Sequence, residues 1–173
     1  GWNRIGYLLK SNSLLNSSFD KATLPTGSLL LKSKDASAIY YPASGWVGDL
    51  DSMKVLNGYM LKTETGGGIR YNAAAVKQKS LLVSPALYLR SDLYTLYNIH
   101  PSDFEYSANL IGEFVNEAGE NTTHKGDLLI AYMAGVPRGV SESVFIADLN
   151  KYVFVVTIFS NAAGEITFQL KPA

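Results

Sequence analysis

YVFVVTIF, residues 152–159, is the stretch that decides the fold. Aromatic and β-branched residues fill it, and these residue types favour the extended chain of a β-strand. Successive residues of a strand point to opposite faces of the sheet, so a run that is apolar throughout has two faces to bury. We therefore expect a central strand that is covered on both sides.

Shorter runs of the same residue types lie on either side of this stretch, and turn-forming residues separate them. The clearest turn signals are ETGGG (64–68), NEAGEN (116–121) and SNAAGE (160–165). Long helical periodicity is absent, although AAAVKQKS (73–80) has the composition for a turn or two of helix. The predicted fold class is therefore all-β, with antiparallel strands. The other predicted strands are Trp2–Leu9, Ser28–Lys32, Ala38–Tyr41, Gly58–Thr63, Ile69–Tyr71, Glu105–Val115, Asp127–Met133 and Ile166–Lys171.

An internal repeat is the strongest pattern in the chain. Gly27 and Asp49 are separated by the same number of residues as Gly126 and Asp148. A genuine duplication explains this order, but strand-turn-strand proteins also reuse the same few residues, so short matches arise easily. The matching segments are RIGYLL (4–9) with LIGEFV (110–115), TGSLLLK (26–32) with KGDLLIA (125–131), GDL (48–50) with ADL (147–149), LNGY (56–59) with LNKY (149–152), and GGIRY (67–71) with GEITF (164–168).

The repeat predicts two tandem, duplicated, antiparallel β-sandwich-like modules. The first module is an aromatic-rich β module at residues 1–75, and the second is a β-sandwich module at 104–173. We expect residues 76–103 to form a structured connector, because this segment contains Leu, Tyr and Ile and is not a flexible linker rich in Gly and Ser. We expect the connector to pack against one or both modules, with a strand as one option. A module of this size without disulfides has a marginal core, so we expect the two modules to pack against each other.

Composition excludes several classes of function. The chain has 15 Lys+Arg and 15 Asp+Glu, so it lacks the basic excess that nucleic-acid binders need. No run of Lys or Arg suits an anionic membrane, and no apolar run is long enough to insert into one. Cysteine is absent, which excludes disulfides and thiolate chemistry. The sequence begins at Gly1-Trp2 without Met, so we expect a processed chain whose signal sequence is missing.

Several segments together resemble a known class of module. GWNRIGY (1–7), GSLLLKSKDASAIYY (27–41), GWVGDLDSM (45–53) and NGYMLKT (57–63) are similar to a segment of large secreted and cell-surface proteins of gut-type Gram-negative anaerobic bacteria. GDLLIAYMAGVPRGV (126–140) resembles a module that often follows it. This chain departs from the pattern at Arg4, where Trp is usual, at Ser28, where Asp is usual, and at Pro137, where Cys often stands. The resemblance implies repeat-type β-sandwich accessory modules of adhesin-like proteins, with an extracellular or cell-surface location.

Catalytic and metal-binding constellations are weak in this sequence. His100 and His124 lie in predicted loops, away from any nucleophile motif or second ligand. Asp49 and Asp51 in GDLDSM are a candidate calcium pair, but a calcium loop needs more oxygen ligands than these two supply. We therefore predict no enzyme activity, no cofactor and no metal.

Aromatic residues of the first module are the best binding candidates: Trp46, Tyr40, Tyr41 and Trp2. Exposed rings can stack on sugar rings while their polar tips form hydrogen bonds. The alternative is that they fill the core, and we favour this for Trp2 and for Tyr59. Trp46 is predicted to lie in a turn, where either role is open. Tyr40 and Tyr41 must point to opposite faces of their strand.

Three residues of GDLLIAYMAGVPRGV are predicted to fasten the ends of a strand. Asp127 can accept a backbone N–H bond and hold a turn. VPRGV is predicted to be a turn, in which Gly139 takes an unusual φ and Arg138 bonds carbonyls or a carboxylate such as Asp127 or Glu142. A ligand contact is the alternative role for Arg138.

The function predicted from the sequence is a non-catalytic structural or adhesive module of an exported or cell-surface bacterial protein. The alternative is a carbohydrate-binding module that uses exposed Trp and Tyr of the N-terminal half. The predicted partner is a glycan or another surface protein, and neither nucleic acid nor membrane insertion is expected.

Overall fold

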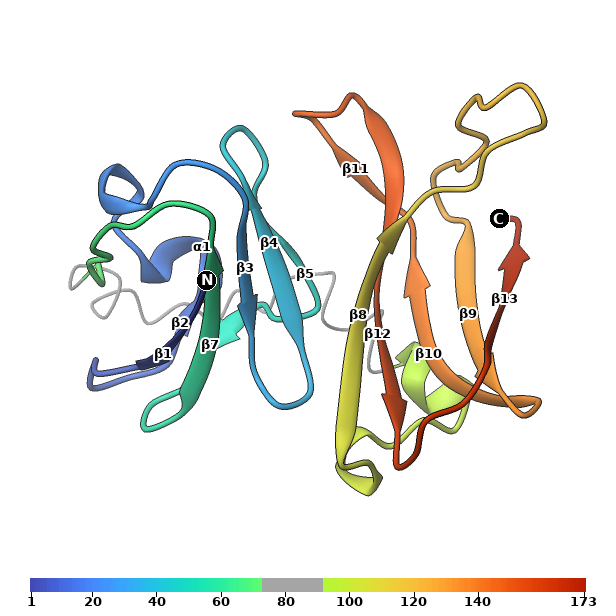
Figure 1. The fold of residues 1–173 in the computed structure, drawn as a ribbon, viewed down its shortest axis with the longest axis horizontal. Helices are drawn as coiled ribbons and strands as arrows, with labels where there is room; N and C mark the ends of the chain where they lie inside the picture. The colour runs from blue at the N-terminus through green and yellow to red at the C-terminus, as the bar shows by residue number, and fades with distance from the viewer. Residues whose placement is uncertain (73–91) are drawn as a thin grey trace. The chain divides into compact units, whose positions relative to one another are not determined.

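The structure is a computed structural model that describes residues 1–72 and 92–173. The chain divides into two compact units, residues 1–84 and 85–173, and each is described by itself (Figure 1). Strands account for 46% of the described residues, and the paired strands among them are antiparallel throughout. The prediction of an all-β fold is therefore confirmed.

Unit 1 is built on a five-stranded sheet with strand order β1-β7-β3-β4-β5. The register aligns one row of side chains across all five strands, from Trp2 through Lys62, Leu30 and Ile39 to Val47. We call the face that carries this row the outer face. In chain order the strands are β1 (Trp2–Gly6), β3 (Leu29–Lys32), β4 (Ser37–Tyr41), β5 (Gly45–Gly48) and β7 (Gly58–Thr63).

The opposite face of this sheet packs on the core of unit 1. Alternation along β3 shows the division, because Leu29 and Leu31 are fully buried whereas Leu30 and Lys32 are only half-buried. The core is completed by residues of three short elements and the chain next to them, including Leu15, Phe19 and Met53. These elements are β2 (Ser13–Leu14), α1 (Leu15–Ser18) and β6 (Ser52–Met53). A short 3-10 helix, η1 (Lys21–Thr23), follows α1.

Residues 69–71 were expected to form a strand, and that prediction is wrong. Only Tyr71 forms a bridge, to Phe19, and its ring stacks on the Phe19 ring with centroids 5.4 Å apart. The Tyr71 hydroxyl donates to the carbonyl of Gly6 at 2.8 Å. Burial raises the pKa of Tyr71, and the neighbouring Tyr7 and Tyr59 add to that rise. Tyr71 therefore closes the core of unit 1 as a single side chain.

Unit 2 contains two three-stranded sheets, with orders β10-β9-β13 and β11-β12-β8 (Figure 1). A single residue, Ser143, separates β10 from β11, and the chain passes from one sheet to the other there. Strands that switch sheets in this way form the corners of sandwich-like folds. The strands are β8 (Tyr106–Gly112), β9 (Leu128–Met133), β10 (Val136–Glu142), β11 (Val144–Ile146), β12 (Lys151–Ser160) and β13 (Ile166–Lys171).

Strand β12 contains the stretch YVFVVTIF and lies at the centre of its sheet. All residues from Val153 to Phe159 are buried. Phe154, Val156 and Ile158 pack with Leu129 in one cluster, whereas Phe159 belongs to a second cluster with Ile130 and Val140. The predicted central strand, covered on both sides, is confirmed.

The connector predicted at residues 76–103 lies partly outside the described residues. Its described part begins with a helical segment at 92–96 and ends in a 3-10 helix, η3 (Pro101–Asp103). Leu93, Tyr94, Tyr97 and Ile99 pack with Phe159 and belong to the core of unit 2. The strand considered for this segment is therefore absent from residues 92–103. The turn of helix considered at residues 73–80 lies outside the described residues.

Both units share some features of the predicted repeat. In unit 1, β1 pairs with β7, and in unit 2 the aligned strand β8 pairs with β12. Gly27 and Gly126, which align, both have positive φ, of 94° and 86°. Strand β3 pairs with β7, however, whereas the aligned strand β9 pairs with β13. The duplicated sandwich arrangement stays a prediction.

Candidate functional site

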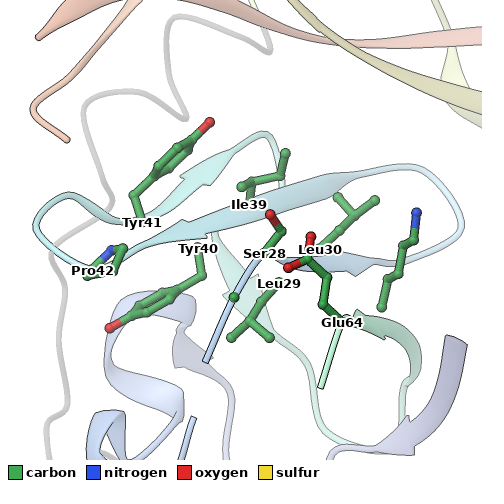
Figure 2. A pocket seen from close by; sticks show the side chains of 10 residues that line it. Ser28, Leu29, Leu30, Ile39, Tyr40, Tyr41, Pro42 and Glu64 are labelled. Atoms are coloured by element: carbon green, nitrogen blue, oxygen red, sulfur yellow. The ribbon is translucent and has the colours of Figure 1, made fainter. Parts of the chain in front are cut away.

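The two faces of the unit 1 sheet divide the four aromatic candidates. Tyr40 pairs with Trp46 across β4 and β5, and their rings lie 5.3 Å apart on the core side. Trp2 pairs with Lys62 and therefore lies on the outer face. Tyr41 follows Tyr40 along β4, so its ring takes the outer face as well. Figure 2 shows the rings of Tyr40 and Tyr41 on opposite sides of the strand.

Trp46 does not lie in a turn, and that prediction is wrong. The residue belongs to β5 and is only 7% exposed. The side chain of Asn16 fixes its backbone, since the Trp46 N–H donates to Asn16 Oδ1 at 2.7 Å and Asn16 Nδ2 donates to the Trp46 carbonyl at 3.1 Å. The ring packs on Phe19, with centroids 5.7 Å apart. Trp46 is thus a core residue and does not present its ring to a ligand.

Trp2 was expected to lie in the core, but the structure places it at the surface. Its side chain is 48% exposed, whereas Tyr59, for which we favoured the same role, is 3% exposed. Tyr59 contributes its hydroxyl to the interior, where it accepts a hydrogen bond from the Lys54 N–H at 2.7 Å. Of the aromatic candidates, Trp2 and Tyr41 are therefore the two that share the outer face.

A hollow of about 670 Å³ opens on this outer face beside Tyr41. Its floor contains Leu30 and Ile39, which are opposite one another on β3 and β4. Ser28, Leu30, Ile39 and Tyr41 point to the same side of these strands in Figure 2. We call this site the outer-face hollow. Its lining residues are Gly27, Ser28, Leu29, Leu30, Ile39, Tyr40, Tyr41, Pro42, Lys62 and Glu64.

Polar groups of three kinds surround the apolar floor. Ser28 supplies a hydroxyl, Lys62 an exposed ammonium group and Glu64 an exposed carboxylate. Gly27 has φ of 94°, and a Cβ at this position would lie 2.7 Å from Glu64 Oε2. Gly27 therefore leaves room for the Glu64 carboxylate at the rim. The hollow combines an aromatic wall, an apolar floor and both donors and acceptors of hydrogen bonds.

Burial shifts the pKa of one lysine on this face. Lys32 lies two residues after Leu30 on β3. Burial lowers the pKa of Lys32, and the charge of Asp49 opposes that change. Asp49 also accepts a hydrogen bond from the Ser37 N–H at 2.7 Å. In the described residues, no group of three or more His, Cys, Asp or Glu side chains is placed to hold a metal ion. The calcium pair considered at Asp49 and Asp51 gains no further acidic ligand.

Asp127 lies at the start of β9 and is buried. Its Oδ2 accepts from the His124 N–H at 2.8 Å, and its Oδ1 accepts from the Ala173 N–H at 3.1 Å. The Asp127 carbonyl accepts from the Ser143 N–H at 2.8 Å. One aspartate thus joins the turn before β9, the crossover at Ser143 and the end of the chain beyond β13.

The predicted VPRGV turn is wrong, because residues 136–142 form strand β10. The turn lies two residues earlier, where Ala134 and Gly135 have φ of 49° and 76°. Gly139 needs its hydrogen side chain for a different reason than φ. A Cβ there would lie 2.5 Å from the carbonyl oxygen of Thr157 in β12.

Arg138 also has a different partner from those predicted. Its guanidinium carbon lies 4.9 Å from the centroid of the Phe104 ring, which is a cation–π contact. Phe104 in turn stacks on Phe159, with centroids 5.9 Å apart. Arg138 Nε is buried without a hydrogen-bond partner among the described residues. Arg138 therefore covers the second core cluster of unit 2 and makes no bond to Asp127 or Glu142 in the described structure.

Both histidines lie in loops. His100 is exposed, and its Nε2 lies 3.2 Å from Asn98 Oδ1. The side chain of His124 is 80% exposed, with Nδ1 3.8 Å from Asp127 Oδ2. Both positions agree with their prediction as loop residues.

Sequence reasoning missed most of the outer-face hollow. The remaining lining residues come from β3, β4 and β7 or lie directly next to these strands, and only the register brings them together. They include Ser28, Leu30, Ile39, Lys62 and Glu64. Alternation along each strand indicated which residues share a face, but it did not indicate which strands are neighbours. No family model matches the chain, and neither does a curated protein or a solved structure. Within residues 1–72 and 92–173, no helix has the length and apolar character that crossing a membrane requires.

Proposed function

We propose that the chain is a non-catalytic, oligosaccharide-binding module through which an exported or cell-surface protein adheres to glycans. The observation that supports this proposal is the outer-face hollow with Tyr41 as its wall. The hollow offers an aromatic ring, an apolar floor and a few polar groups, which is the composition typical of small-ligand sites.

A saccharide suits these groups better than a purely apolar or purely ionic ligand. The C–H face of a sugar ring can stack on Tyr41, because aromatic faces are weakly negative and bury apolar surface. Hydroxyl groups of the sugar can bond Ser28, Lys62 and Glu64 at the same time. Lys62 and Glu64 have opposite charges, so the ligand need not have a net charge.

The length of the ligand follows from the position of Trp2. It lies on the same face as Lys62, on the edge strand β1, and is 48% exposed. Three strand spacings separate β1 from β4, which corresponds to about 14 Å. A platform of that span, with a ring near each end, fits an oligosaccharide better than a single sugar.

The chemistry of the hollow favours binding over hydrolysis. Most glycosidases place two carboxyl groups on either side of the scissile bond. Among the described residues that line the hollow, Glu64 supplies the one carboxylate. The extracellular setting is supported by the resemblance of residues 1–63 and 126–140 to modules of bacterial surface proteins.

Affinity electrophoresis through gels that contain common polysaccharides tests this function, after a glycan array has chosen the ligand. Tyr41→Ala and Trp2→Ala should each weaken binding about tenfold, which corresponds to about 1.4 kcal/mol. Tyr106→Ala is the matched control, since Tyr106 is 64% exposed and lies in unit 2. Tryptophan fluorescence should stay unchanged in Tyr41→Ala, which would show that the core around Trp46 is intact. Absence of binding to every glycan, or equal loss in the control, would contradict the proposal.

A further inference from the structure

Two leucines at one end of the unit 1 sheet are almost fully exposed. Leu8 is 82% exposed and Leu56 is 93% exposed. Gly6 opposes Gly58, and the Tyr7 N–H donates to the Asn57 carbonyl at 3.0 Å, so the segments that contain Leu8 and Leu56 leave the sheet next to each other. Both residues lie beyond the last paired residues of β1 and β7. Nothing in the core of unit 1 requires an apolar side chain at either position.

The backbone at Leu56 makes its side chain harder to explain by folding alone. The Asn57 N–H donates to the Lys54 carbonyl at 3.2 Å, which closes a turn with Leu56 in its third position. Leu56 has φ of 64°, a left-handed conformation that Gly or Asn adopts at lower cost. In the aligned segment LNKY (149–152), the left-handed residue is Asn150, with φ of 51°, one position after the counterpart of Leu56. Folding stability alone would favour Asn or Gly at position 56.

A lysine lies close to each of the two leucines along the chain. Lys10 and Lys54 are exposed, and each lies two residues from one of the leucines. The two loops are tied together, because the Val55 N–H donates to Asn12 Oδ1 at 2.9 Å. Residues 1–19 and 52–63 contain Arg4, Lys10, Lys54 and Lys62 but no Asp or Glu. None of these four cations forms an ion pair within the part of the chain that the structure describes. Asp51, three residues before Lys54, is the acidic residue closest to this lysine along the chain.

We infer that Leu8, Leu56, Lys10 and Lys54, here called the leucine tip, dock unit 1 on the surface of an anionic phospholipid bilayer. The leucines enter the boundary between headgroups and acyl chains, and the lysines bind the anionic headgroups. Such a surface contact is peripheral and requires no membrane-spanning segment. The linear sequence shows no basic run because Lys10 and Lys54 lie in separate loops, which the hydrogen bond from Val55 to Asn12 joins.

Charge complementarity favours a bilayer over a second copy of this chain. The tip repeats the same positive sign in every copy, so two tips would repel each other. A bilayer presents many negative headgroups beside an apolar layer, which matches both components of the tip. The inference is independent of the proposed glycan site, because none of the four residues of the leucine tip lines the outer-face hollow.

Co-sedimentation of the full chain with vesicles tests this inference. The chain should sediment with phosphatidylcholine–phosphatidylglycerol vesicles, less with phosphatidylcholine alone, and less as salt rises. Lys10→Gln and Lys54→Gln should each lower the partition coefficient about fivefold. Absence of sedimentation with the anionic vesicles, or sedimentation that is insensitive to both substitutions, would overturn the inference.

Leu56→Asn separates this role from a role in folding. The substitution should reduce vesicle binding severalfold while it raises the melting temperature, because Asn tolerates a left-handed φ better than Leu. Leu96→Ser is the matched control, since Leu96 is 70% exposed in unit 2 and should leave binding unchanged. Equal loss of binding in both variants would overturn the assignment of the tip, as would full binding by Leu56→Asn.

Discussion

At the scale of single residues, Gly139 shows how closely β10 approaches β12. A methyl group there would meet the Thr157 carbonyl oxygen at 2.5 Å, Val156 Cγ2 at 3.1 Å and Ile158 Cα at 3.3 Å. Two of these three atoms belong to the backbone and cannot move aside cheaply. We therefore expect Gly139→Ala to lower the free energy of unfolding by about 2 kcal/mol in urea titrations. Gly112→Ala, with no atom within 4 Å of its Cβ, should change it by less than about 0.5 kcal/mol. Similar losses in the two variants would contradict this account.

The same scale shows what the sequence could and could not predict about the site. The alternation of side chains along β4 correctly assigned Tyr40 and Tyr41 to opposite faces of the sheet. It could not indicate which ring faces the core, because that depends on the neighbouring Trp46 and Phe19. Trp46 looked like a turn residue because glycines flank it, yet those glycines lie within a strand. Gly48 has φ of 158°, and a Cβ there would lie 2.1 Å from the Ser37 carbonyl oxygen, so its glycine reflects a close approach between strands.

At the scale of elements, a charged pair joins the loop after β8 to the start of β12. Lys151 Nζ donates to Glu113 Oε1 at 2.6 Å, and the amide of Asn121 donates to Glu113 Oε2. The bond from Lys151 is the main reason that the pKa of Glu113 lies below its ordinary value of 4.5. A carboxyl group whose pKa is lowered by folding stabilises the fold above its unfolded pKa, and this contribution disappears as the pH falls through the folded pKa.

Glu113→Gln should therefore lower the melting temperature near neutral pH and have little effect below about pH 4. Melting temperatures at several pH values, measured by circular dichroism, give this comparison. Glu117→Gln is the control, because Glu117 lies exposed in the same loop. An effect of Glu113→Gln that is equally large at acidic pH would show that the charged pair is not its cause.

Element boundaries were predicted well where alternation or continuous burial was strong, as in β7, β9, β12 and β13. They failed at residues 136–142, where Pro137 and Gly139 suggested a turn. The structure accommodates both residues through a register shift between Pro137 and Gly139 in the pairing with β9. A bulge of this kind has the same local composition as a turn, so tertiary pairing decides between them.

At the scale of the whole molecule, the two units have separate cores. Trp2 and Trp46 are the two tryptophans of the chain and both lie in unit 1, so tryptophan fluorescence reports the unfolding of that unit. Leu129 is 3% exposed in unit 2, and Leu129→Ala should destabilise unit 2 by about 3 kcal/mol. If the units pack together as the sequence predicts, the fluorescence midpoint in urea should fall as well.

Circular dichroism, which reports both units, provides the second signal for this experiment. Leu31→Ala, in the core of unit 1, is the positive control for a shift in fluorescence. A fluorescence midpoint that stays constant while the dichroism transition moves would contradict packing between the units. The all-β class was predictable from composition and alternation, whereas strand order depends on long-range pairing that local patterns do not encode.

The passage of the chain from β10 to β11 has a consequence for how unit 2 opens. One continuous backbone pairs with β9 up to Glu142 and with β12 from Val144 onward. Because Ser143 alone joins β10 to β11, separation of β10 from β9 should also disturb the pairing of β11 with β12, and the reverse. Unit 2 should therefore behave in hydrogen exchange as a single cooperative foldon, in which the amides of β9 and β12 are released together.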